Sequence, residues 1–317
     1  IVILIIGIIF DLIGGVLPGA LAFFGFVLSN FKFVGAIILF YSESSRLKKL
    51  FYYILIYLLG VSIYRALFHD FILWSTFFYM FWAVKHKPSV PTILVTILAG
   101  ALFASTLQTI KAAYRTEIWN NNSDNKIELF VSLMIDGFLT EESDNPELDD
   151  GIDSNVRLNQ GWIISAILDH IPKSREYFGG STIKEAVFAS LLPRILNPNK
   201  TTAGGKENFR EFTGLNLTGA SMGISIIGEA YGNFAKIGGI VFMGFWGFFL
   251  ARVWIFLLKR VQYRPILIAF IPLMFLQVIK AETELVVVLN HLVKASIVVF
   301  LFLWGAKNVL KWKLSDG

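Results

Sequence analysis

The chain has 317 residues, of which 55% are hydrophobic and 16% are charged, and its formal charge at pH 7 is +5. A water-soluble domain usually carries roughly a quarter charged residues, so this composition is typical of a membrane protein instead. Cysteine is absent, which excludes disulfides, thiolate metal sites and cysteine nucleophiles.

Several apolar runs are long enough to cross a bilayer, which takes ~20 residues per helix. The chain starts without methionine inside one such run, so we expect the protein to extend further toward its N-terminus. The sequence predicts an all-α polytopic membrane protein with about eight visible transmembrane helices, because only helices satisfy the backbone of such runs in lipid. They are expected near residues 1–17, 19–41, 50–68, 70–84, 90–107, 237–258, 265–281 and 285–304.

This set of spans divides the chain into four parts. Residues 1–107 hold about five transmembrane helices, and residues 237–304 hold about three. Between them lies a loop domain, 108–236, and a basic tail follows at 305–317. A connection this long is usually functional or disordered.

Basic residues gather in alternate short loops and in the tail, which predicts that this side of the membrane is cytoplasmic. The loop domain is then extracytoplasmic, and the tail is cytoplasmic. Residues 109–236 contain 12 basic and 17 acidic residues, a net charge of −5, so the basic balance of the chain belongs to the short loops and the tail. No nucleic-acid partner is expected. The basic residues of the short loops and tail are Arg46, Lys48, Lys49, Lys85, Lys87, Lys259, Arg260, Arg264, Lys307, Lys311 and Lys313.

The loop domain is expected to be partly helical. Amphipathic or apolar segments at 126–138, 157–172 and 181–194 predict three short helices, the last with Thr182 and Glu185 as a capping box. No phosphate-binding P-loop, dinucleotide fingerprint or H-E-x-x-H motif is present, and the chain has only four histidines. We therefore expect no cofactor and no metal.

Cations recur between these short helices, and arginine suits phosphate because its planar fork can donate two parallel hydrogen bonds. They predict a site for a lipid-linked phosphate or diphosphate, although ordinary surface pairing is the alternative for each one. Their positions are Arg157, Arg175, Arg194, Lys200, Lys206 and Arg210.

Other polar residues have two interpretations each. His170 is on the line Trp162–Ala166–His170 of its helix, so it is either a buried core histidine or a general base. Glu282 and Asn290, at and within the last span, indicate either a polar clamp between helices or the wall of a cavity.

The stretch "GEAYGNFAKIGG", residues 228–239, joins the loop domain to a span. Its glycines permit close helix packing, and Tyr231 is placed to anchor at the interface. Glu229 and Asn233 are four residues apart and therefore share a helix face, which makes Glu229 a candidate general base.

This stretch resembles the G-E-x-Y-x-N-F-G-x-x-G pattern of Wzy-type O-antigen polymerases. "SLLPR" at 190–194 and "AETELVVVLNHLVK" at 281–294 are similar to the flanking segments of that family, so the resemblance covers about residues 155–300. Ala235 departs from the pattern, which often has glycine there.

The resemblance implies a GT-C-like fold and an inverting, metal-independent glycosyltransferase of the bacterial inner membrane. The enzyme would polymerise undecaprenyl-diphosphate-linked oligosaccharides (O-antigen, capsule or exopolysaccharide) at the outer face, with a chain-length regulator protein as a candidate partner. The alternatives are a ligase-like transferase, a polysaccharide or lipid transporter or flippase, and a non-catalytic subunit.

We assign hypothetical roles on this basis. The diphosphate ligands are Arg157, Arg194 and Arg210, with Lys200 and Lys206 closing over the lipid head group. The general base is Glu229 or His170, and the substrate wall is formed by Tyr231, Asn233, Glu282 and Asn290.

Overall fold

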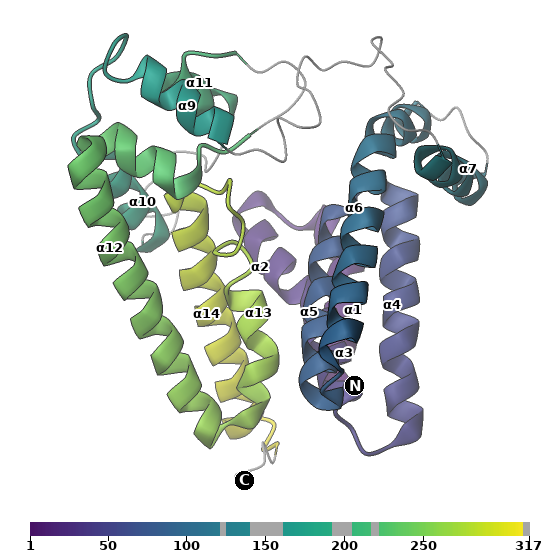
Figure 1. The fold of residues 1–317 in the computed structure, drawn as a ribbon. Coiled ribbons are helices and arrows are strands. Elements are labelled where there is room, and N and C mark those ends of the chain that lie inside the picture. Colours follow the sequence, from purple (N-terminus) through teal and green to yellow (C-terminus); the bar gives the residue numbers. More distant parts are fainter. Residues whose placement is uncertain (121–124, 140–160, 192–204, 217–221, 313–317) are drawn as a thin grey trace. The chain divides into compact units, whose positions relative to one another are not determined.

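The computed structural model describes residues 1–120, 125–139, 161–191, 205–216 and 222–312 (Figure 1). Within these ranges every regular element is a helix and no strand occurs. The predicted all-α class is confirmed. Among the described residues, five helical segments are long and apolar enough to cross a membrane, as expected of a multi-pass membrane protein: Leu21–Phe40, Ser45–Arg65, Val90–Trp119, Ser225–Tyr263 and Leu285–Asn308.

The chain divides into two compact units, and each is described by itself. One unit comprises Ile1 and residues 35–155, and the other comprises residues 2–34 and 156–317. The first unit contains the second half of α3 (Phe31–Phe40), α4 (Ser45–Arg65), α5 (His69–His86), α6 (Val90–Trp119) and α7 (Lys126–Leu139).

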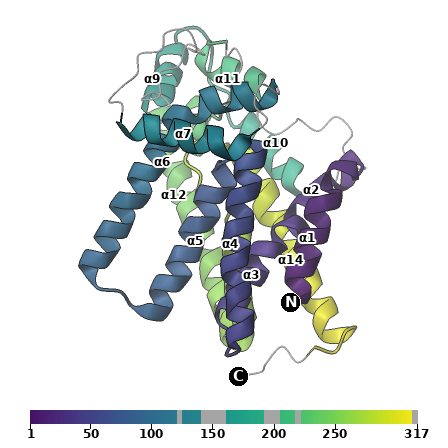
Figure 2. The ribbon, with the colours of Figure 1, turned by 90° about the vertical axis from the view of Figure 1, so that its right-hand side faces the viewer.

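The first unit is organised around the end of α6. This helix has 30 residues and is about 45 Å long, which exceeds the ~30 Å hydrocarbon core of a bilayer. Its last turns pack against α7, which crosses it in Figure 2, and bury Leu107, Ile110 and Tyr114 with Phe130 and Met134. The Tyr114 hydroxyl donates to the carbonyl of Ile63 at 2.8 Å and so connects α6 to the end of α4.

The second unit is built on α14, which packs against α10 and α2. An ion pair between Asp11 and Lys32, 3.0 Å apart and almost fully buried, joins α1 to the start of α3. The unit contains α1 (Val2–Ile13), η1 (Gly14–Val16), α2 (Gly19–Ser29), α9 (Gly161–His170), α10 (Ser181–Leu191), α11 (Lys206–Thr213), α12 (Ser225–Tyr263), η3 (Pro265–Phe270), α13 (Ile271–Met274) and α14 (Leu285–Asn308).

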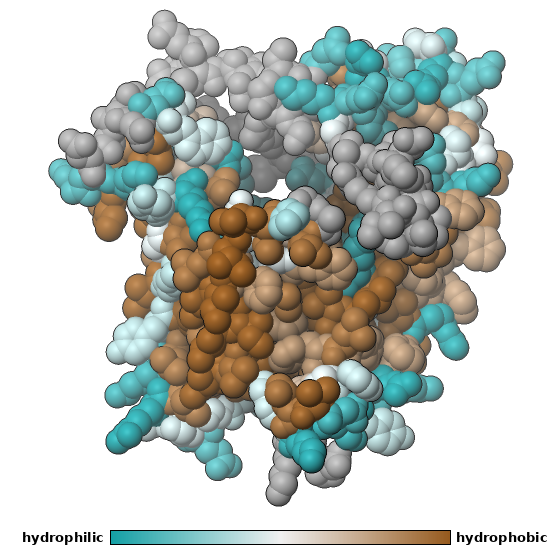
Figure 3. All heavy atoms as spheres, turned by 180° about the vertical axis from the view of Figure 1, so that it is seen from behind, coloured by the Kyte–Doolittle hydropathy of each residue, from teal (hydrophilic) through white to brown (hydrophobic). Residues whose placement is uncertain are grey.

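Large apolar side chains stay exposed along the long helices. Ile237, Phe245 and Phe248 on α12 are 79%, 70% and 66% exposed, and Leu98 on α6 is 69% exposed. Figure 3 shows such apolar surface on the face turned away from the viewer of Figure 1. Because contiguous exposed apolar surface marks a membrane or protein contact, and these helices have span length, we assign these faces to lipid.

Three of the predicted helices differ from the structure. The span expected at 265–281 is not one helix, because η3 and α13 end at Met274 and turns follow. Pro272 lacks a backbone N–H group and interrupts an α-helical ladder between η3 and α13, whereas Pro265 occupies the first turn of η3, where proline is tolerated. The run at 19–41 is divided at Asn30, whose side chain donates to the carbonyl of Phe26. The last predicted helix of the first part does not stop at 107 but continues to Trp119.

Candidate functional site

The stretch 228–239 contains a break in α12. Ala235 has φ 58° and ψ −170°, a combination that is essentially restricted to glycine, and it separates a short helical piece, 225–234, from the long span that follows. Figure 1 shows the resulting bend near the top of α12. The predicted start of the span at 237 is thus close to the observed one.

The break leaves backbone carbonyls without helical partners, as at any helix C-terminus. The turn before α10 supplies the missing donors. The N–H of Phe178 donates to the carbonyl of Gly232 at 2.9 Å, and the N–H of Gly179 donates to the carbonyl of Asn233 at 3.1 Å. The N–H of Gly180 donates to Asn233 Oδ1 at 3.1 Å. Gly179 and Gly180 both have positive φ, which fits glycine in this turn.

Glu229 connects three helices through its carboxylate. Thr182 Oγ1, on α10, donates to Glu229 Oε1 at 2.8 Å, and the backbone N–H of Leu285 donates to Glu229 Oε2 at 2.8 Å. Leu285 is the first residue of α14, so Glu229 caps that helix from a distant part of the chain. The side chain is only 3% exposed.

Asn233 extends this network, and its shared face with Glu229 is confirmed. Asn233 Nδ2 donates to the carbonyl of Glu229 at 2.8 Å and to Thr182 Oγ1 at 2.7 Å. The capping-box prediction is wrong for Thr182. Helix α10 begins one residue earlier, at Ser181, and the Thr182 hydroxyl is used by Glu229.

Glu284 is a second buried carboxylate next to Glu229. It is 2% exposed and lies just before α14, and Asn208 Nδ2 of α11 donates to its Oε2 at 2.5 Å. Burial raises the pKa of Glu284 to about 7, the Glu229 carboxylate adds to this rise, and the hydrogen bond from Asn208 opposes it. Its protonation therefore changes near neutral pH.

Both carboxylates line a cavity of about 330 Å³ in the second unit. The described residues around it carry mainly negative charge, with glutamates 185, 207 and 211 in addition to Glu229 and Glu284, and Arg175 as a cation. The Arg175 guanidinium lies 3.5 Å from Glu211 Oε2 and over the ring of Phe178. Among the described residues, no group of three or more His, Asp or Glu side chains is arranged to hold a metal ion.

Such a lining suits hydroxyl groups better than phosphates. Carboxylate oxygens accept hydrogen bonds from hydroxyls, whereas several carboxylates repel a diphosphate. Arg175, the one cation among the described lining residues, is 40% exposed at its side chain, and so it is accessible from outside the cavity. The described cavity thus has an acidic interior with an arginine in its lining.

Within the described part of the chain, the predicted diphosphate ligands do not converge on one site. Lys206 and Arg210 are exposed on α11 and do not line the cavity, although their neighbours Glu207, Asn208 and Glu211 do. Three of the predicted ligands lie outside the described residues: Arg157, Arg194 and Lys200.

The other predicted residues occupy different surroundings. His170 is half-buried, with its ring against Gly214, because the buried line of α9 is Ile163 and Ile167 rather than Trp162 and Ala166. Tyr231 lies outside the cavity lining, and its hydroxyl donates to the carbonyl of Ile171 at 3.1 Å.

Glu282 and Asn290 were also predicted to form the substrate wall, and both lie away from this lining. Glu282 is exposed, and its backbone carbonyl accepts a hydrogen bond from the backbone N–H of Ser225 at 3.2 Å. Asn290 is buried within α14, where its Nδ2 donates to the carbonyl of Val286. This bond lies within one helix and does not by itself connect Asn290 to a neighbouring helix, so the choice between clamp and wall stays a prediction.

The sequence interpretation missed Thr182, Asn208 and Glu284 as parts of one site, and it named Arg175 only as one of the cations of a phosphate site. The i, i+4 pair Glu207 and Glu211 was a usable signal, because it places two acids on one face of α11. No signal of spacing connects Thr182 to Glu229, since 47 residues separate them.

Comparison of this chain with protein-family models, curated proteins and solved structures finds no match.

Proposed function

We propose that the protein is a membrane glycosyltransferase that polymerises lipid-diphosphate-linked oligosaccharides, with the acidic cavity as the site for the acceptor sugar. The observation that carries the proposal is the pair of buried carboxylates, Glu229 and Glu284, at a cavity large enough for a sugar ring. The resemblance of "GEAYGNFAKIGG" to the Wzy-type pattern supports the proposed reaction class.

In the proposed reaction, the acceptor hydroxyl oxygen attacks the anomeric carbon of the donor sugar. The bond between that carbon and the diphosphate oxygen breaks, and the lipid diphosphate leaves with the electron pair. A base removes the hydroxyl proton. Glu284 suits this role better than Glu229, because both Glu229 oxygens already accept hydrogen bonds from Thr182 and Leu285. The Glu284 pKa of about 7 is also near the working pH, where a general base is most effective.

Glu229 and Asn233 are positioning residues in this proposal. Both oxygens of Glu229 already accept hydrogen bonds, and Asn233 fixes Thr182 and the turn that leads into α10. They hold the first turns of α10 and α14, and Glu284 is the residue directly before α14. Catalytic groups need such support, since small displacements lower rates strongly.

The diphosphate requires cations, and Arg175 is the described one in the lining. We assign it to the leaving diphosphate, where a donor stabilises the charge that develops in the transition state. Arg157, Arg194, Arg210, Lys200 and Lys206 remain proposed ligands for the rest of the head group.

The finer topology belongs to the same proposal. We assign a GT-C-like arrangement in a bacterial inner membrane, built on the five helical segments of span length together with the shorter apolar helices. The basic short loops and the tail lie on the cytoplasmic side, and the segment that carries the cavity lies on the outer side, where lipid-linked repeats are presented.

The test is complementation of a host strain that lacks this chain, read as the ladder of glycan lengths on a gel. Glu284→Gln is expected to abolish the ladder while the protein still accumulates in the membrane. Arg175→Ala is expected to lower polymer yield by 10²-fold or more, as for loss of one transition-state donor. The matched control is Glu176→Gln, an exposed acid outside the lining.

Each rival function has a distinct outcome in this assay. A ligase-like transferase leaves polymer length unchanged and prevents its transfer to the final acceptor. A flippase loses all lipid-linked material on the outer face, and a non-catalytic subunit tolerates Glu284→Gln. A normal ladder in both the Glu284→Gln and Arg175→Ala strains would overturn the assignment of the cavity.

A further inference from the structure

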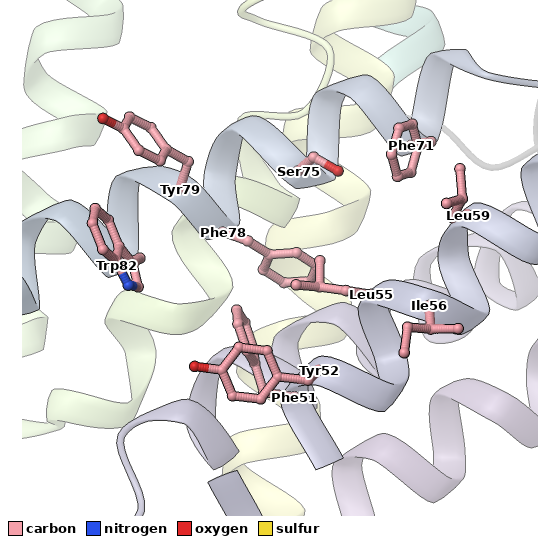
Figure 4. Close-up of a pocket in the computed structure, with 10 residues that line it drawn as sticks. All are labelled: Phe51, Tyr52, Leu55, Ile56, Leu59, Phe71, Ser75, Phe78, Tyr79 and Trp82. Atoms are coloured by element: carbon pink, nitrogen blue, oxygen red, sulfur yellow. The ribbon is translucent and has the colours of Figure 1, made fainter. Parts of the chain in front are cut away.

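A second cavity lies in the first unit, between α4 and α5. It is a groove of about 450 Å³, lined almost entirely by apolar and aromatic side chains (Figure 4). Phe51, Leu55 and Leu59 of α4 follow one side of it, and Phe71, Phe78 and Trp82 of α5 follow the other. The residues from 51 to 59 extend the groove over about 12 Å of helix.

The groove is open along its length. Tyr52 and Ile56, which line it from α4, are 54% and 68% exposed. Because α4 is long and apolar enough to cross a membrane, the medium outside an open groove on it is hydrocarbon. A hydrocarbon chain therefore fits the groove in shape and in chemistry.

Cations gather at one end of this groove. Helices α4 and α5 are antiparallel neighbours joined by a short turn, so the first turn of α4 and the last turn of α5 lie at the same end. The hydrogen bond from Lys85 Nζ to the carbonyl of Phe40 at 2.8 Å is at this end too. The basic residues here are Arg46, Lys48, Lys49, Lys85 and Lys87.

Most of this charge is unbalanced. Glu43 is the acid in residues 42–50, and residues 83–88 contain none. Lys85 is engaged with Phe40 and Tyr41. Within the described part of the chain, Arg46, Lys48, Lys49 and Lys87 make no ion pair. Tyr79, next to Trp82 at the same end, also has a buried hydroxyl without a hydrogen-bond partner among the described residues.

We propose that this groove binds one anionic phospholipid, with an acyl chain between α4 and α5 and its phosphate at the cationic end. The groove provides apolar contact area for the acyl chain. The cations attract the net negative charge of an anionic head group, which a zwitterionic lipid lacks. Unlike the acidic cavity, this site needs no sugar or diphosphate, and it is independent of the proposed glycosyltransferase activity.

The experiment uses the full chain, purified in detergent, with a phosphatidylglycerol that carries a photoactivatable group on one acyl chain. After irradiation, the attached peptides are identified by mass spectrometry. We expect attachment to concentrate in residues 51–59 and 71–82. Unlabelled phosphatidylglycerol should compete at least tenfold better than phosphatidylcholine of the same chains, because one basic residue near an anionic lipid surface strengthens binding roughly fivefold.

The charge variant is Arg46→Gln, Lys48→Gln, Lys49→Gln and Lys87→Gln in one chain, and it should lose this preference for phosphatidylglycerol. The matched control removes four cations elsewhere, by Lys259→Gln, Arg264→Gln, Lys307→Gln and Lys311→Gln, and should keep the preference. Glycerol phosphate, which has the anion without the chain, should not compete.

Three results would each overturn the proposal. They are equal competition by the two lipids, attachment of the labelled lipid spread evenly over all spans, and occupation of the groove by a second copy of the protein in place of the lipid. Competition by glycerol phosphate alone would instead indicate a free-anion site and would also contradict the lipid assignment. The elution volume of each variant on size exclusion shows whether it is folded, and a variant that fails is replaced by its Lys48→Gln and Lys49→Gln subset.

Discussion

Glu284 links the chemistry of the acidic cavity to the stability of the fold. Its ordinary pKa of 4.5 rises to about 7 because the side chain is buried beside Glu229. The folded state thus holds a proton over this pH interval that the unfolded state has released. Stability from this group is greatest below pH 4.5, falls as pH rises toward 7, and is constant above it.

We therefore predict that Glu284→Gln removes a pH-dependent loss of stability of up to about 3 kcal/mol. The thermal unfolding midpoint in detergent, measured from pH 5 to pH 8, should fall less steeply with pH for the variant than for the parent chain. Equal slopes for the two proteins would show that Glu284 does not titrate in this interval. The activity of the parent chain should rise between pH 5 and pH 8 while its stability falls, because the proposed base must be ionised.

The contact between Thr182 and Glu229 allows a second residue-level prediction. Thr182→Val keeps the shape of the side chain and removes the donor, so it leaves Glu229 Oε1 buried without its partner. We expect a loss of about 1–3 kcal/mol in the free energy of unfolding. In a double-mutant cycle with Glu229→Gln, the two losses should not add, whereas additive losses would mean that the hydrogen bond contributes nothing.

At the scale of the elements, the break in α12 determines where the cavity forms. The short piece 225–234 presents Glu229 and Asn233 to the ends of α10 and α14, and the long piece after Ala235 has the length of a span. A straight helix would carry these side chains on a continuous helical surface and would leave no free carbonyls for the turn before α10. The strained residue thus separates a site-forming segment from a membrane segment.

Ala235→Gly should stabilise the protein by about 1 kcal/mol or more, because glycine adopts this backbone conformation without the steric cost that alanine carries. The matched control is Ala230→Gly, at a buried and regular position of the same helix, which should destabilise by about 1 kcal/mol. Both variants are compared by thermal unfolding in detergent. A destabilised Ala235→Gly variant would show that the bend is not strained.

At the scale of the whole molecule, the absence of cysteine from these 317 residues permits a direct test of orientation. Single cysteines placed by Glu43→Cys and Lys87→Cys should react with a membrane-impermeant maleimide only after the cells are opened. Glu176→Cys, exposed near the acidic cavity, should react in intact spheroplasts. Labelling of all three from the same side would contradict the assigned topology, and the parent chain provides the unlabelled background.

The local pattern of apolar residues was sufficient to predict much of the helical architecture. The apolar runs at 50–68, 70–84, 90–107 and 285–304 predicted helices, because a run of this length must satisfy its own backbone in lipid. The structure contains these helices at 45–65, 69–86, 90–119 and 285–308, so their existence was predicted and their ends were not. The same reasoning failed at 265–281, where Pro272 interrupts the ladder. The i, i+4 spacing also predicted the shared face of Glu229 and Asn233.

The composition of the site depended on contacts between residues that are distant in the chain. Glu229 meets Thr182 and Leu285 across 47 and 56 positions, and Asn208 meets Glu284 across 76. No local pattern encodes such pairs, because they follow from how α10, α11, α12 and α14 pack. The sequence by itself determined the helical class, the long apolar segments and the common helix face of Glu229 and Asn233. Only the tertiary structure decided which carboxylates are buried together and that the cavity they line is acidic, since burial and charge proximity arise from packing.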